Sequence, residues 1–110
     1  MSQTVAPEPG RLLIDGQWAD ARSGKTFATI NPADESVITQ VAEAGPEDVD
    51  AAVAAGRKAW ESGPWPKMSA ADRGKILWRM GELILERLAH LSLLETLDTG
   101  KTLFDSGKIE

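Results

Sequence analysis

The spacing of apolar residues predicts strands in the first part of the chain and helices in the second. Two short apolar runs, 12–14 and 17–19, flank the dipeptide Asp15-Gly16. This arrangement favours a tight β-hairpin, because glycine adopts positive φ without strain. The segment Ala21–Lys25 (ARSGK) predicts a second turn, so we expect the hairpin to end before it.

A second pair of strands is predicted next. Residues 27–30 (FATI) are suited to a strand, and residues 37–42 (VITQVA) are rich in β-branched side chains that alternate with other types. Asn31-Pro32 closes the first of these strands, because proline holds the residue before it in extended geometry and lacks an amide donor. We therefore expect the two segments to pair.

A helix is predicted to begin at Gly45-Pro46, since proline is tolerated at the first helical position. Its apolar face recurs at helical spacing and consists of Val49, Ala52, Val53, Gly56 and Trp60. The acidic residues at its start are interpreted as a solvated run favoured by the positive end of the helix dipole: Glu43, Glu47, Asp48 and Asp50.

Two further helices follow a loop at residues 62–66. Ser69 followed by Asp72 resembles a capping box, with Asp in place of the usual Glu. The helix after it carries a wide apolar stripe: Ile76, Leu77, Met80, Leu83, Ile84 and Leu88. The next helix, around residues 91–97, ends near Gly100, which suits a left-handed cap.

This order of elements predicts an α+β fold of two short β-hairpins followed by three helices. Residues 1–11 are polar and proline-rich and predict a loose arm, and residues 101–110 are weakly helical. A length of 110 residues suits one domain, and no internal repeat divides it.

Composition excludes several kinds of chemistry. The chain has no cysteine and one histidine, His90, which rules out disulfides, a thiol nucleophile within these residues and a cysteine- or multi-histidine-ligated metal. A net charge of −5 predicts that nucleic acid is not a partner. Charged residues interrupt every long apolar stretch, and the first ten residues lack the pattern of a secretory signal. We therefore expect no membrane partner and a cytoplasmic location.

One short segment raises a question of charge. Asp98-Thr99-Gly100-Lys101 is interpreted as a helix end capped by Gly100, because the strand required before a phosphate loop is missing. A carboxylate in the last turn of a helix faces the negative end of the dipole. Three explanations are open for Asp98, namely compensation by Lys101, exposure to solvent, or a bound cation.

Several longer phrases, in order and in register, are more specific. They are LLIDGQW, FATINPADESVITQVAEAGPEDVDAAVAAGRKAW and SAADRGKILWRMGELILERLAHLSLLETLDTGK. From about Leu12 to its end the chain resembles the amino-terminal part of an NAD(P)-dependent aldehyde dehydrogenase, above all the betaine-aldehyde-like members. The resemblance implies that residues 1–110 are a fragment, the amino-terminal part of a Rossmann-like α/β cofactor domain, and that the catalytic and oligomerisation regions are absent.

The resemblance also implies an activity for the full-length protein. It would oxidise a small-molecule aldehyde to a carboxylic acid with NAD or NADP, through a cysteine thiohemiacetal and thioester, as a homodimer or homotetramer. No catalytic or dinucleotide-binding residue of the family matches a position in this chain, so we expect it to be inactive alone.

One family site does map onto the chain. By resemblance, the main-chain carbonyls of Thr29 and Ile30 and the carboxylate of Asp98 would hold a potassium or sodium ion, with a further ligand from the absent part. Oxygen ligands suit such a hard cation.

A rival hypothesis is a free-standing, non-enzymatic helical interaction module derived from the same family. The absence of catalytic groups and the one-domain size favour it. A cooperative melt of the isolated chain would favour this module, whereas a molten or aggregating chain would favour a fragment whose apolar stripe has lost its partner.

Overall fold

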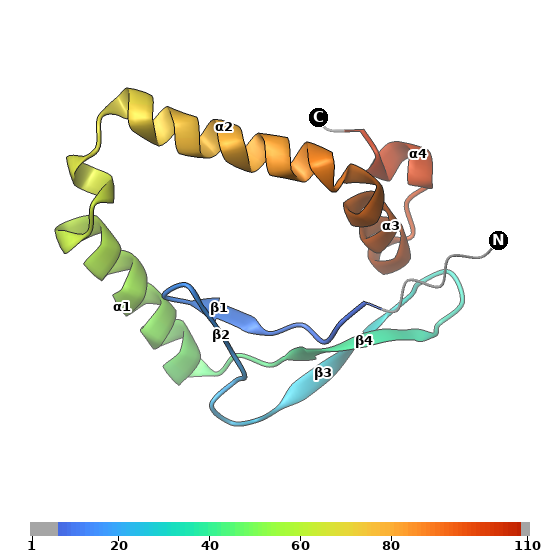
Figure 1. Ribbon diagram of the computed structural model, residues 1–110. Coiled ribbons are helices and arrows are strands. Elements are labelled where there is room, and N and C mark those ends of the chain that lie inside the picture. Colours follow the sequence, from blue (N-terminus) through green and yellow to red (C-terminus); the bar gives the residue numbers. More distant parts are fainter. Residues whose placement is uncertain (1–6, 109–110) are drawn as a thin grey trace.

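The computed structural model describes residues 7–108, and in these the strands precede the helices, as predicted (Figure 1). The strands form two separate two-stranded antiparallel sheets. The first sheet pairs β1 with β2, and the second pairs β3 with β4. Their bounds are β1 Leu12–Ile14, β2 Gln17–Ala19, β3 Thr26–Ile30 and β4 Val37–Ala42.

The first hairpin turns at the predicted dipeptide. Asp15 and Gly16 both have positive φ, of 52° and 74°. Two successive residues with positive φ are typical of the turn whose twist matches that of paired strands. The turn after β2 is also confirmed, because the Gly24 amide, with a φ of 70°, donates to the carbonyl of Ala21 at 2.8 Å.

One residue that precedes the first hairpin, Gly10, pairs with the second hairpin. Gly10 forms an isolated parallel bridge with Val41, in which the Gly10 amide donates to Gln40 and the Ala42 amide donates to Gly10, both at 2.9 Å. The end of the predicted loose arm is therefore bound to β4. The first six residues of that arm lie outside the described residues.

The three predicted helices are present, with a 3₁₀ turn and a short fourth helix besides. Leu88, which the apolar stripe assigned to the second helix, instead begins the third, and His90 lies in its first turn. Between residues 7 and 108 the helices are all too short or too polar to cross a lipid bilayer. Their bounds are α1 Pro46–Ser62, η1 Trp65–Lys67, α2 Ala70–Glu86, α3 Leu88–Thr99 and α4 Leu103–Ser106.

Asp48 corrects the interpretation of the acidic residues at the start of α1 as a solvated run. Its side chain is buried, with 5% of its surface exposed. The carboxylate accepts hydrogen bonds from the amides of Gly45 at 2.9 Å and Arg22 at 3.1 Å. A carboxylate at the third helical position that bonds the N-cap amide forms half of a capping box. Asp48 thus holds the turn after β2 against the start of α1.

The start of α2 follows the predicted capping pattern. The hydroxyl of Ser69 accepts a hydrogen bond from the Asp72 amide at 3.1 Å and donates one to the Asp72 carboxylate at 2.9 Å. Lys75 lies 3.0 Å from the same carboxylate. The hydrogen bonds from Lys75 and then Ser69 lower the pKa of Asp72 below its ordinary value.

The chain forms an open arc, with the strands on one side and α2 on the other (Figure 1). Its radius of gyration is 17.3 Å, against about 13 Å for a compact domain of this length. Its accessible surface is 8697 Å², against roughly 5,900 Å² for a folded monomer of this mass. Ala21 is the one buried apolar residue in the described part. The predicted apolar faces of α1 and α2 are therefore left largely exposed.

The role of Asp48 leads to a local prediction. In the 110-residue chain, Asp48→Ala should speed hydrogen exchange at the amides of Arg22 and Gly45 by about tenfold, because each loses a hydrogen bond to a charged group. Asp50→Ala, at an exposed neighbouring position, is the control and should leave both rates unchanged. Equal rates in the two variants would contradict the role given to Asp48.

Candidate cation site

A groove of about 450 Å³ lies between the β3–β4 hairpin and the last turns of α3. Two of the three predicted cation ligands, Thr29 and Asp98, line it. Ile30 follows Thr29 directly but is not among the lining residues, and its side chain is exposed. The fold thus brings together a strand and a helix end that are far apart in the sequence.

The cap of α3 also lies close to the turn that follows β3. Gly100 has a φ of 75°, and its amide donates to the carbonyl of Thr96, which is the left-handed cap predicted from the sequence. A Cβ atom at Gly100 would lie 3.1 Å from Cγ of Pro32. The cap of α3 is therefore held close to the Asn31-Pro32 turn that ends β3.

The strand is irregular where the predicted carbonyl ligands lie. Thr29 pairs with Thr39, but Ile30 pairs with Val37, so the register shifts between Thr29 and Ile30. A shift of this kind disrupts the ladder of hydrogen bonds locally. Main-chain oxygens near such a shift are available to other partners more readily than those inside a regular ladder.

The turn after β3 is held by its own side chains. The carbonyl oxygen of the Asn31 side chain accepts a hydrogen bond from the Ala33 amide at 2.9 Å. The Asp34 carboxylate accepts hydrogen bonds from the hydroxyl and the amide of Ser36, and these bonds lower the pKa of Asp34. The turn that carries Pro32 toward α3 is thus closed by local hydrogen bonds.

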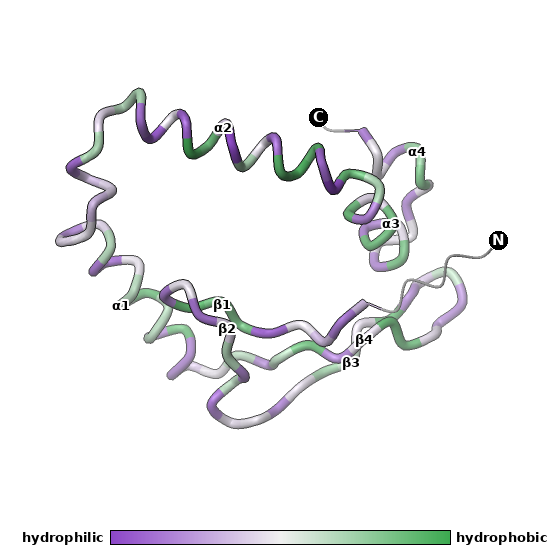
Figure 2. Tube along the Cα trace, viewed as in Figure 1, coloured by the Kyte–Doolittle hydropathy of each residue, from purple (hydrophilic) through white to green (hydrophobic). Residues whose placement is uncertain are grey.

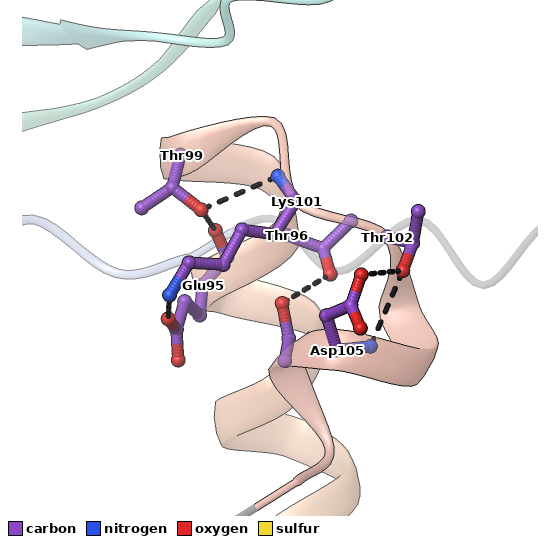
Figure 3. A network of polar contacts seen from close by, with 7 residues as sticks. Glu95, Thr96, Thr99, Lys101, Thr102 and Asp105 are labelled. Atoms are coloured by element: carbon purple, nitrogen blue, oxygen red, sulfur yellow. Dashed lines mark hydrogen bonds and ion pairs between the residues drawn. The ribbon is translucent and has the colours of Figure 1, made fainter.

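The charges at the end of α3 are distributed unevenly. Lys101 reaches back to Glu95, with its ammonium 2.7 Å from a carboxylate oxygen (Figure 3). Asp98 is exposed, and within residues 7–108 no side chain forms a hydrogen bond or ion pair with its carboxylate. The last turn of α3 contains no basic residue. Of the explanations open for Asp98, exposure is confirmed, and the charge of the carboxylate is left without a neighbouring partner in the described chain.

The groove has further acidic residues that the sequence did not single out as site residues. Glu95 and Glu8 also line it. The spacing of Glu95 and Asp98, three positions apart on one helix, could have shown that they share a face. Glu8 gives no such signal. Among residues 7–108, no group of three or more His, Cys, Asp or Glu side chains is placed to hold a metal ion, so a cation here would depend on main-chain oxygens as well.

Comparison with known proteins gives the family. A model of the aldehyde dehydrogenase family matches residues 18–110. The chain belongs to the aldehyde dehydrogenase family. It is 44% identical over 106 residues to the mitochondrial benzaldehyde dehydrogenase of Antirrhinum majus, covering 96% of this chain and 20% of that protein. The chain thus spans between a tenth and a fifth of the length of these curated relatives, whose names include both mitochondrial and cytosolic proteins.

Solved structures of the family share the fold. An NAD-dependent aldehyde dehydrogenase from Sinorhizobium meliloti superposes with a TM-score of 0.90 at 36% identity, over 96% of this chain and 22% of that one. A betaine aldehyde dehydrogenase from Staphylococcus aureus, solved with NAD⁺, superposes with a TM-score of 0.86 at 42% identity, over 88% of this chain and 20% of that one. The predicted fold class and the predicted family are both confirmed.

The contact between Gly100 and Pro32 can be tested by substitution. In the 110-residue chain, Gly100→Ala should strain the left-handed cap and displace Pro32 slightly, because the new methyl carbon would lie 3.1 Å from Cγ of Pro32. We expect the NMR signals of Asn31 and Thr99 to shift and amide exchange in the last turn of α3 to accelerate. Gly74→Ala, in an open helical position, is the control. Unchanged signals in the Gly100 variant would contradict the contact.

Proposed function

We propose that this chain is the amino-terminal part of an aldehyde dehydrogenase that oxidises an aldehyde to a carboxylic acid with NAD or NADP. The observation that carries the proposal is the match to NAD-dependent aldehyde dehydrogenases, in sequence and in fold, over nearly the whole chain. The chain itself contains no cysteine. The thiol that forms the thiohemiacetal and thioester, and the groups that bind the dinucleotide, would come from the part of the protein outside these residues.

The contribution of this chain is structural in the proposed enzyme. Its two hairpins and helices would form the outer amino-terminal part of the cofactor domain. A cytoplasmic location and assembly as a homodimer or homotetramer stay predictions. No observation favours the rival interaction module, since the exposed faces of α1 and α2 leave the chain without an apolar core of its own.

We further propose that Thr29, Ile30 and Asp98 take part in a site for potassium or sodium. Three observations support it: Thr29 and Asp98 line the same groove, the register shifts at the Thr29–Ile30 step, and the Asp98 carboxylate has no ion-pair partner within residues 7–108. A cation bound there would offset the unfavourable position of Asp98 at the negative end of the α3 dipole. It would fasten the end of β3 to the end of α3, and it would take no part in the oxidation.

The enzyme proposal is tested on the native protein isolated from its source. Its intact mass should be several times the 11.8 kDa of this chain. The intact protein should reduce NAD⁺ or NADP⁺ in the presence of an aldehyde, and the 110-residue chain alone should show no such activity, since it has no thiol. A native mass of 11.8 kDa, or an intact protein inactive with every aldehyde and both dinucleotides, would sink the proposal.

The cation site is tested in the same intact protein. Potassium chloride should raise its thermal midpoint relative to tetramethylammonium chloride at equal ionic strength, because only the small cation fits oxygen ligands. Asp98→Asn should abolish this difference, since the site loses its one carboxylate. Asp50→Asn, an exposed carboxylate on α1, is the control and should retain it. An ion-specific difference that persists in the Asp98 variant would remove Asp98 from the site.

A further inference from the structure

Helix α2 carries a large apolar surface that the rest of the described chain leaves open. Hydrophobic segments recur along the whole helix in Figure 2. They flank a groove of about 730 Å³ along one side of the helix. We call this the α2 apolar surface and define it by Gly74, Leu77, Trp78, Gly81, Ile84 and Leu85.

These apolar side chains are more exposed than is usual for neighbouring residues on the surface of a folded protein. Leu77 is 59% exposed, Trp78 76% and Leu85 60%, and all lie within little more than two turns of one helix. Single apolar residues at a protein surface are ordinary, but a contiguous patch of this kind marks an interaction site.

Two glycines show how closely a partner can approach. Gly74 and Gly81 lie seven positions apart, on the same face, and a Cβ atom at either would meet nothing within 4 Å. Glycine inside a helix is less favourable than alanine, so two glycines on one face call for a packing reason. Gly74 and Gly81 lie on either side of Leu77 and Trp78 along the helix. They leave room for an apolar element to pack against the helix backbone.

The opposite side of α2 is suited to water. There Arg79 forms an ion pair with Glu86 at 2.9 Å, and Lys75 pairs with Asp72 at 3.0 Å. Arg79 also pairs at 3.1 Å with Glu82, which lies at the edge of the groove. These side chains are about half exposed or more. The helix therefore has one charged side that needs no cover and one apolar side that does.

We propose that the α2 apolar surface is the seam at which this chain packs against the remainder of its own aldehyde dehydrogenase fold. The inference rests on the proposed function. The superposed Sinorhizobium meliloti enzyme has the same arrangement of elements, and this chain matches 22% of its length, so most of that fold lies outside the matched part. A second copy of this chain is disfavoured as the occupant, because two copies that each carry a net charge of −5 repel one another.

The seam is tested in the intact protein by a charge placed at its centre. Leu77→Lys should lower the thermal midpoint by about 5 °C or more, because the ammonium would be buried without a partner. Glu86→Lys makes the same new side chain on the charged side of the same helix and should change the midpoint by less than about 2 °C. Equal effects of the two substitutions would overturn the proposal.

A second, milder substitution tests the proposal if the Leu77→Lys protein does not fold. In the intact protein, Leu77→Ala should accelerate amide exchange across α2 by at least about tenfold, since it opens a cavity at the seam. Glu86→Ala, on the charged side of the same helix, is the control and should leave exchange in the intact protein within about twofold. Similar acceleration in both variants would overturn the proposal.

The association state distinguishes a failure of the seam from a failure of the proposed enzyme. If the native mass is 11.8 kDa, the enzyme proposal falls. The 110-residue chain could instead form a discrete dimer that Leu77→Lys dissociates. The α2 apolar surface would then bind a second copy, and the seam proposal would be overturned. An intact enzyme that is active, yet insensitive to Leu77→Lys, would overturn the seam and leave the enzyme proposal standing.

Discussion

Hydrogen bonds at the ends of helices and turns hold this chain in shape, because little apolar surface is buried to do so. Asp48 is the central case, since its buried carboxylate joins the turn at Arg22 to the start of α1. Ser69 and Thr102 cap the starts of α2 and α4. The hydroxyl of each accepts a hydrogen bond from the amide three residues later. The bonds of Ser69 and Thr102 act over one turn of chain, so they define local geometry well and leave the arc open.

The features that the sequence predicted are the ones set by neighbouring residues. The turn at Asp15-Gly16 and the cap at Gly100 follow from the backbone freedom of glycine, which needs no knowledge of the rest of the fold. The burial of Asp48 was missed because its second partner, the amide of Arg22, lies 26 positions earlier. A carboxylate at the start of a helix is usually solvated, and only the tertiary contact shows otherwise.

The same distinction applies to the candidate cation site. Family resemblance selected Thr29 and Asp98, and the groove between β3 and α3 contains both. Helical spacing explains why Glu95 shares that groove, whereas Glu8 enters it through the bridge from Gly10 to β4, which no local pattern reveals. Lys101 pairs with Glu95, whereas the Asp98 carboxylate has no such partner in the described part of the chain.

The contact between Pro32 and Gly100 has a kinetic consequence. It joins residues about seventy positions apart, and the conformational entropy lost on closing a loop grows with its length. The hairpins and helices between them need only local contacts, which form in microseconds. Formation of this contact between the turn after β3 and the end of α3 is therefore expected to be a late event in folding. With few apolar contacts to reinforce it, the same joint would be among the first to open.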